Sequence, residues 1–141
     1  MPGALLSPDE TRWSELLDGV DHDFYHLPRY VQLEAGRMEG KPVLFLYEED
    51  EDRFLLPLVI RSVMVAGERV ADVFDASSPY GYPCPLMRAR PANEAAFAQR
   101  AIATLKQSLA AEKVCSVFVR MHPLLPPAAP LLDAMNEAGA T

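Results

Sequence analysis

The chain has 141 residues, of which half are hydrophobic, and a formal net charge of -7. This length allows one domain with its own core, and the composition is typical of a folded protein rather than a disordered one. The acidic balance disfavours a nucleic-acid-binding protein, which needs a basic surface to displace counterions, and it disfavours docking on an anionic membrane.

The cysteines and the N-terminus indicate the compartment. Cys84 and Cys115 form neither a CxxC pair nor a zinc-binding spacing, so we expect both thiols to be reduced and the protein to be cytoplasmic. The first residues, MPGALLSPDETRW, lack the basic start and the apolar centre of a signal peptide. We also expect no membrane segment, because no apolar run reaches the roughly 18 to 20 residues that span a bilayer.

Two short helices are predicted in the first third of the chain. Ser7 and Pro8 are typical of an N-cap and a first helical position, and the apolar residues that follow fall on one face, which predicts a helix over residues 7–20. A second helix is expected over residues 28–37, because Pro28 suits a first helical turn.

The middle of the chain predicts an antiparallel meander. Three apolar segments with short links indicate consecutive strands, at residues 43–47, 53–63 and 69–75. The acidic run 48–52 is expected to form the first turn and Gly67 the second. Pro57 has no N–H to give to a neighbouring strand, so it indicates an edge position or a bulge.

The last third of the chain predicts a helix, a strand and a helix. The alanine-rich stretch 89–114 has apolar residues at helical spacing and predicts the longest helix. Residues 114–119 are mainly β-branched or aromatic and predict a strand, and a final helix is expected over residues 128–138, ended by Gly139. The whole order of elements predicts one α+β domain over residues 1–141.

The segment SSPYGYPCP, residues 77–85, lies between a predicted strand and the longest predicted helix. Its prolines make it stiff, and Gly81 permits a backbone conformation or a close approach that other residues forbid. Tyr80 and Tyr82 each offer an aromatic face and a hydroxyl. Two interpretations stay open: a preformed cradle for an anion or a substrate beside a helix N-terminus, or a rigid turn whose tyrosines pack on the core.

Arg120 and His122 follow the predicted strand 114–119. Since alternate residues of a strand point to the same face, these two side chains are expected to project together. They would hold an anionic ligand if that face is open, and otherwise they would form a polar outer face.

The remaining histidines and cysteines favour structural roles. His22 and His26 precede a helix start rather than sharing a helix face, so exposed or capping roles are favoured over metal binding. Cys84 would need a neighbouring base to act as a nucleophile, and none is near it in sequence. Cys115 alternates with valines and is interpreted as a small core residue.

Several motifs carry a family resemblance. The segments DHDFYHLPRYVQLEAG, LPLVIRSV, ADVFDASSPYGYPCPL and VFVRMHPLL stand in this order along the chain. A D-x-Y-x-x-P-x-Y pattern begins at Asp23, and a D-x-x-SPYGY pattern begins at Asp75. Together these motifs, over roughly residues 21–138, resemble the N-terminal part of GNAT-fold proteins. The most similar branch is the Fem-type branch, whose members attach amino acids to peptidoglycan precursors.

The resemblance implies a GNAT-like fold, with a mixed, mostly antiparallel sheet flanked by helices and here without its last strands. It also implies the first of two tandem units. The first unit shapes the acceptor groove, and the second receives the donor, acyl-CoA or aminoacyl-tRNA. The family's R/Q-x-x-G-x-G/A pyrophosphate loop would align with residues 78–83, where Ser78 replaces the first residue and Pro83 the second glycine. Because proline has no N–H for a phosphate, we expect this loop not to bind acyl-CoA.

Two functional hypotheses follow. The first is the acceptor-binding N-terminal unit of a GNAT-type acyl- or aminoacyl-transferase that has a second unit downstream. It assigns substrate contact to Tyr80, Gly81, Tyr82, Arg120 and His122, and it identifies no catalytic residue. The second is a non-catalytic module that forms a homodimer or binds a protein partner through the exposed edge of an incomplete sheet. Neither hypothesis includes a metal or direct binding of nucleic acid.

Overall fold

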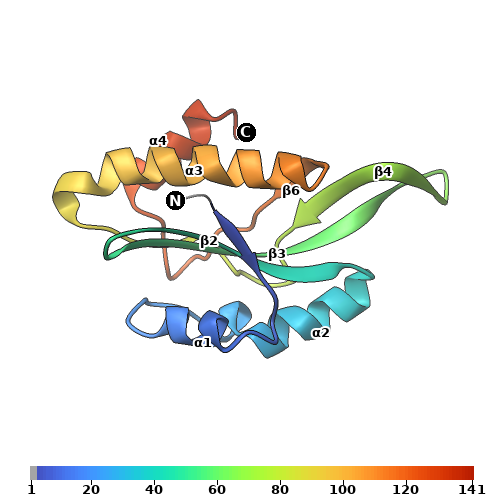
Figure 1. Ribbon diagram of the computed structural model, residues 1–141, viewed down its shortest axis with the longest axis horizontal. Helices are drawn as coiled ribbons and strands as arrows, with labels where there is room; N and C mark the ends of the chain where they lie inside the picture. The colour runs from blue at the N-terminus through green and yellow to red at the C-terminus, as the bar shows by residue number, and fades with distance from the viewer. Residues whose placement is uncertain (1–2) are drawn as a thin grey trace.

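The computed structural model describes residues 3–141, which form an α+β fold with a sheet of six strands and four α-helices (Figure 1). The elements are β1 (Ala4–Leu6), α1 (Thr11–Leu17), α2 (Pro28–Met38), β2 (Lys41–Glu49), β3 (Asp52–Val65), β4 (Glu68–Ser77), β5 (Leu86–Arg88), α3 (Glu94–Ala111), β6 (Val114–Phe118) and α4 (Ala129–Glu137). Two short 3-10 helices, η1 (Phe24–His26) and η2 (Pro91–Asn93), precede α2 and α3.

The sheet is mixed and mostly antiparallel, in the order β1-β2-β3-β4-β6. Only β6 runs parallel to its neighbour, β4, and β5 pairs with β3 beyond the end of β4. Helices α1 and α2 cover one face of the sheet, and α3 and α4 cover the other (Figure 1). This arrangement is consistent with the expected GNAT-like mixed fold.

The core is divided between the two faces of the sheet. Phe45 and Phe54 point toward Phe97 of α3, whereas Leu44 and Leu55 join Trp13 of α1 on the other face. Neighbouring residues of β2 and β3 are therefore buried on opposite sides. Coverage of both faces explains why these strands are continuously apolar in sequence rather than alternating.

The first helix begins later than the sequence predicts. Residues Ala4–Leu6 pair with β2 as the edge strand β1, which the sequence analysis did not predict, and helix α1 starts only at Thr11. Ser7 and Glu10 form a turn between them, in which the Ser7 N–H donates to the Glu10 carboxylate at 2.6 Å. The predicted serine cap is thus wrong, because the turn uses Ser7 before the helix begins. Helix α2 confirms the second prediction.

The predicted meander is confirmed by β2, β3 and β4, although Pro57 lies in an interior strand and not at an edge. It faces Leu44 of β2 on one side. On the other side the pairing of β3 with β5 ends at Leu55 and its pairing with β4 starts at Val59, so the described strands leave a gap opposite Pro57. Such a gap tolerates a residue without an N–H.

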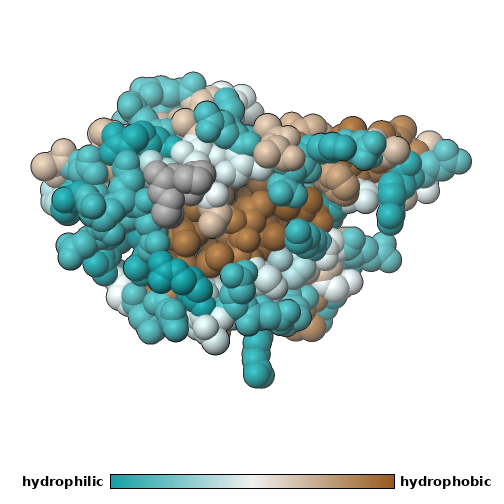
Figure 2. Space-filling view, viewed as in Figure 1, coloured by the Kyte–Doolittle hydropathy of each residue, from teal (hydrophilic) through white to brown (hydrophobic). Residues whose placement is uncertain are grey.

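The β3–β4 hairpin projects from the body as an arm (Figure 1). Gly67 makes its turn as predicted, together with Ala66, and both have positive φ, as a tight hairpin turn requires. Exposed Met64 and Val65 give the arm an apolar surface (Figure 2). The same view shows an apolar surface between α2 and α3, where β1 crosses the near edge of the sheet.

The longest helix is shorter than predicted. The chain first pairs with β3 as β5 and then makes η2 at Pro91, so α3 begins only at Glu94. The segment SSPYGYPCP therefore leads into a strand and not into a helix N-terminus, which removes the helix dipole from the proposed anion cradle.

Strand β6 also differs from its prediction. It ends at Phe118, so Arg120 and His122 lie in the following loop and do not alternate on a strand. Cys115 is exposed, contrary to the predicted core position, because both faces of β6 are open to solvent over Cys115–Phe118.

The last helix, α4, confirms its prediction, and Gly139 follows it with a φ of 98°. This is the left-handed conformation that commonly ends helices. In the part of the chain that the structure describes, no helix is long and apolar enough to cross a membrane.

Candidate functional site

An aromatic cluster forms where the loop between β4 and β5 meets η1 and the first turn of α2. We use this name for Phe24, Tyr25, Tyr30 and Tyr82, whose rings contact one another, and for Tyr80, whose carbonyl accepts from the Tyr30 hydroxyl. The ring of Tyr25 lies at its centre, 4.1 Å from Phe24, 5.4 Å from Tyr30 and 6.0 Å from Tyr82 between centroids. Three of the five side chains, those of Phe24, Tyr80 and Tyr82, are exposed. Aromatic faces are therefore available to a ligand.

The loop that carries Tyr80 and Tyr82 is fixed at several points. The Ser78 N–H donates to the Phe118 carbonyl at 2.8 Å, which ties the loop to the end of β6. The Tyr30 hydroxyl donates to the Tyr80 carbonyl at 2.6 Å, which ties it to α2. These bonds make the loop a preformed surface rather than one that must be ordered on binding.

Gly81 is required by both conformation and space. Its φ is 97°, a region that residues with a Cβ rarely adopt. A Cβ built at this position would overlap the ring of Tyr25. The glycine therefore allows the loop backbone to lie directly on the centre of the aromatic cluster.

His122 and Asp23 connect the aromatic cluster to the loop after β6. The N–H groups of Leu124 and Leu125 donate to His122 Nδ1 at 3.0 and 3.1 Å. Nδ1 is therefore the acceptor nitrogen, and Nε2 carries the proton that is donated to Asp23 Oδ2 at 2.8 Å. Because the ring is buried and both nitrogens are engaged, this geometry favours a positioning role for His122. His122 is therefore not part of a polar outer face, which was one of the two interpretations of Arg120 and His122.

Asp23 is a carboxylate with several donors. The hydrogen bond from His122, together with the bond from the Phe24 N–H, lowers the pKa of Asp23 below its ordinary value of 3.8. A carboxylate with a lowered pKa is a poor proton acceptor near neutral pH. Asp23 is suited to orient His122 and to attract a cationic group, rather than to act as a general base.

His26 has a structural role, in agreement with the capping interpretation. The Asp23 N–H donates to His26 Nδ1 at 3.0 Å, and His26 Nε2 lies 3.0 Å from the Cys84 carbonyl. The ring is fully buried, and this burial lowers its pKa. No group of histidine, cysteine, aspartate and glutamate side chains suited to a metal ion is found among residues 3–141.

Cys84 is a buried thiol beside His26. Its burial raises its pKa, which disfavours the reactive thiolate. The fold brings a base close to the thiol that is distant in sequence, because His26 Nε2 lies 3.8 Å from the Cys84 sulfur. However, that nitrogen is already engaged with a carbonyl, so the pair favours a packing role for Cys84.

Arg120 adds a positive charge to the cluster. Its guanidinium carbon lies 5.5 Å from the centroid of Tyr80 and 6.0 Å from that of Phe118. Its backbone N–H donates to the Ser78 hydroxyl at 3.0 Å, which holds the loops together. The side chain is exposed and forms no ion pair with the described residues. Arg120 can therefore contact an anionic or aromatic ligand.

The structure thus brings all five sequence-predicted residues to one place, Tyr80, Gly81, Tyr82, Arg120 and His122. Asp23, Tyr25 and Tyr30 also lie at this site, although they were not among the predicted site residues. Their signal was the D-x-Y-x-x-P-x-Y pattern, in which Asp23, Tyr25 and Tyr30 are three of the four fixed positions. The arrangement offers aromatic faces, one cation and one carboxylate, and these groups are suited to bind a ligand. It contains no free general base.

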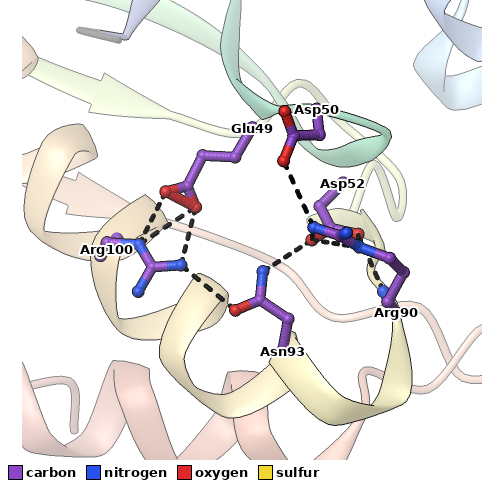
Figure 3. A network of polar contacts seen from close by, with 6 residues as sticks. All are labelled: Glu49, Asp50, Asp52, Arg90, Asn93 and Arg100. Atoms are coloured by element: carbon purple, nitrogen blue, oxygen red, sulfur yellow. Dashed lines mark hydrogen bonds and ion pairs between the residues drawn. The ribbon is translucent and has the colours of Figure 1, made fainter.

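A separate cluster of charged and polar side chains, the hairpin cluster, lies at the β2–β3 hairpin (Figure 3). Asp52 is buried and accepts hydrogen bonds from the Arg90 side chain and from Asn93 Nδ2, the latter at 2.7 Å. Glu49 forms a bidentate pair with Arg100 of α3. These contacts hold the hairpin against the start of α3, and they leave the charges paired within the protein.

Comparison with known proteins assigns no family to this chain, because no family model, no curated protein and no solved structure matches it.

Proposed function

We propose that this chain is the acceptor-binding N-terminal unit of a GNAT-type acyl- or aminoacyl-transferase that works in the cytoplasm. The observation that carries the proposal is the convergence of three separate segments on the aromatic cluster, with Arg120 and Asp23 beside it. The acceptor amine would lie near the Asp23 carboxylate, and its apolar or sugar-like parts would stack on Tyr80 and Tyr82.

The chemistry expected of the complete enzyme is attack of an acceptor amine on an activated acyl carbonyl. The donor, acyl-CoA or aminoacyl-tRNA, would bind a second GNAT-like unit downstream. The loop of this unit supports that division, because Pro83 gives no N–H and because β5 separates the loop from the N-terminus of α3. The described residues include no group to which we assign general-base catalysis.

The proposal is tested by NMR titration with a peptidoglycan stem peptide that has a free lysine amine, and separately with acetyl-CoA. We expect the peptide to shift the amide signals of Tyr80, Gly81 and Tyr82, and we expect acetyl-CoA to leave them unchanged. Arg120→Gln should weaken the peptide effect, whereas Arg69→Gln, an exposed arginine on the β3–β4 arm, should not. Saturable shifts with acetyl-CoA at these residues would place the donor here and contradict the proposal.

A second candidate function is supported by β6. This strand pairs with β4 alone among the described strands, and Val117 and Phe118 are 39% and 60% exposed on it. An open edge with apolar side chains is suited to pair with another chain. In this alternative the protein is a non-catalytic module that forms a homodimer or binds a protein partner.

The two candidates are separated by sedimentation over a range of concentrations. Edge pairing requires a concentration-dependent dimer that Phe118→Glu abolishes. A monomer at all concentrations contradicts the homodimer form of the second candidate.

A further inference from the structure

We propose that a pocket beside β5 binds a small zwitterion with an aliphatic part, such as an amino acid or a dipeptide. The pocket has a volume of about 440 Å³ and is lined by residues 19–21, residues 85–88, residues 124–128 and Leu131 of α4. Ligand pockets in proteins usually measure roughly 300 to 1,000 Å³, so this volume suits a small molecule. The proposal does not depend on the transferase function.

Two opposite charges line this pocket, on Arg88 and Asp21. Arg88 Nη1 donates to the Gly19 carbonyl at 3.2 Å, which positions the guanidinium. Within residues 3–141, the ion pairs include neither Arg88 nor Asp21. A bound carboxylate would find a charge-assisted partner in Arg88, and a bound ammonium would find one in Asp21.

The walls select the same kind of ligand. Pro85, Pro126 and Pro127 have no N–H groups, so these three residues offer no backbone donor to a carboxylate. Arg88 is therefore the side chain that fixes the carboxylate end. Leu124 is 82% exposed at this wall, and an aliphatic side chain of the ligand would cover it.

The pocket is structurally connected to the aromatic cluster but separate from it. Leu124 and Leu125 line the pocket, and their N–H groups are the donors to His122 Nδ1. His122 therefore fixes the backbone of one pocket wall. The protein side chains proposed to contact a ligand differ between the two sites, so each site can be tested alone.

The test uses three matched probes, which are Leu-Leu, its N-acetyl form without the ammonium, and its amide without the carboxylate. Binding is followed by NMR at the amide signals of Met87, Leu124 and Leu125, with each probe titrated to about 10 mM, where a Kd near 1 mM would approach saturation. We expect Leu-Leu to bind best. Arg88→Gln should weaken Leu-Leu about tenfold and remove its advantage over the amide.

Asp21→Asn provides the second variant. It should remove the advantage of Leu-Leu over the N-acetyl form and leave the advantage over the amide intact. Arg69→Gln is the matched control and should change nothing. The proposal is overturned if the signals show no saturable shift, if the three probes bind equally, or if Arg88→Gln binds Leu-Leu as the unchanged protein does. Titration with the stem peptide at Tyr80–Tyr82 is a separate readout, so failure here leaves the proposed function standing.

Discussion

At the β2–β3 hairpin, charged side chains pair with other charged side chains, whereas at the aromatic cluster the guanidinium of Arg120 meets an aromatic ring and solvent. Asp52 accepts from Arg90 and Asn93, and this cluster is satisfied within the protein (Figure 3). Arg120 instead places its guanidinium over Tyr80 and forms no ion pair with the described residues. A dense cluster of charged side chains can therefore be purely structural. A few exposed charged side chains beside a preformed loop are the better candidates for ligand binding.

The largest effect is expected from Gly81→Ala, which should destabilise the protein by about 3 kcal/mol. The new Cβ adopts an unfavourable φ and also overlaps Tyr25, so strain and overpacking add. Urea denaturation measures the change. Gly67→Ala is the control, because Gly67 has a similar φ of 80° but nothing within 4 Å of its added Cβ. It should cost about 1 kcal/mol. Equal costs for the two variants would show that the contact with Tyr25 does not matter.

The hairpin cluster should determine much of the acid sensitivity of the fold. Hydrogen bonds from Arg90, then Asn93, hold the pKa of Asp52 far below its ordinary value of 3.8. A lowered pKa in the folded state gives stability that is present above the unfolded value and is lost as the pH falls below it. We therefore expect the free energy of unfolding to fall steeply below about pH 4, and less steeply in Asp52→Asn.

Urea denaturation at several pH values measures this slope. Asp50→Asn is the matched control, because the Asp50 side chain is 82% exposed and its only ion pair among the described residues is a 3.6 Å contact with Arg90. The same slope in Asp52→Asn and in the unchanged protein would contradict the assignment.

A smaller effect is expected from His122→Phe, about 2 kcal/mol. The substitution leaves the N–H groups of Leu124 and Leu125 without their acceptor and removes the donor to Asp23. The pKa of Asp23 should then rise toward its ordinary value, since the His122 hydrogen bond is the main cause of its lowering. NMR titration of the Asp23 carboxyl carbon measures this change.

His22→Phe is the control for that experiment, because His22 is exposed and contacts only the Val20 carbonyl among the recorded hydrogen bonds. It should leave the pKa of Asp23 nearly unchanged. An unaltered Asp23 pKa in His122→Phe would mean that the pair does not exist in solution.

The sequence predicted the framework of the fold because its signals are local. The meander, α2 and α4 follow from apolar runs, from Pro28 and from Gly139, and each element was found close to its expected bounds. The errors arose where tertiary pairing decides. Residues Ala4–Leu6 become a strand only because β2 offers an edge, and β5 forms only because β3 extends past β4.

The sequence predicted which residues belong to the candidate site, but it did not predict how the fold brings them together. Arg120 and His122 were selected for alternation on a strand, yet β6 ends at Phe118 and the two side chains reach the site from a loop. The buried His122 is held by a hydrogen bond from its Nε2 to Asp23, 99 positions away in the chain. No local sequence pattern predicts a hydrogen bond between residues so far apart, although the pattern that begins at Asp23 contains the acceptor of this bond.

The smallest effect on stability, about 0.5 kcal/mol, is expected from Arg120→Gln, since an exposed cation over an aromatic ring contributes little to folding. The same substitution at Arg90 should cost more, because it removes the partner of the buried Asp52. Urea denaturation of the two variants side by side compares the two regions with one chemical change. The order of the two losses is the decisive result. A larger loss for Arg120→Gln would make Arg120 a structural residue, and its free guanidinium could then no longer be counted as a contact for the acceptor.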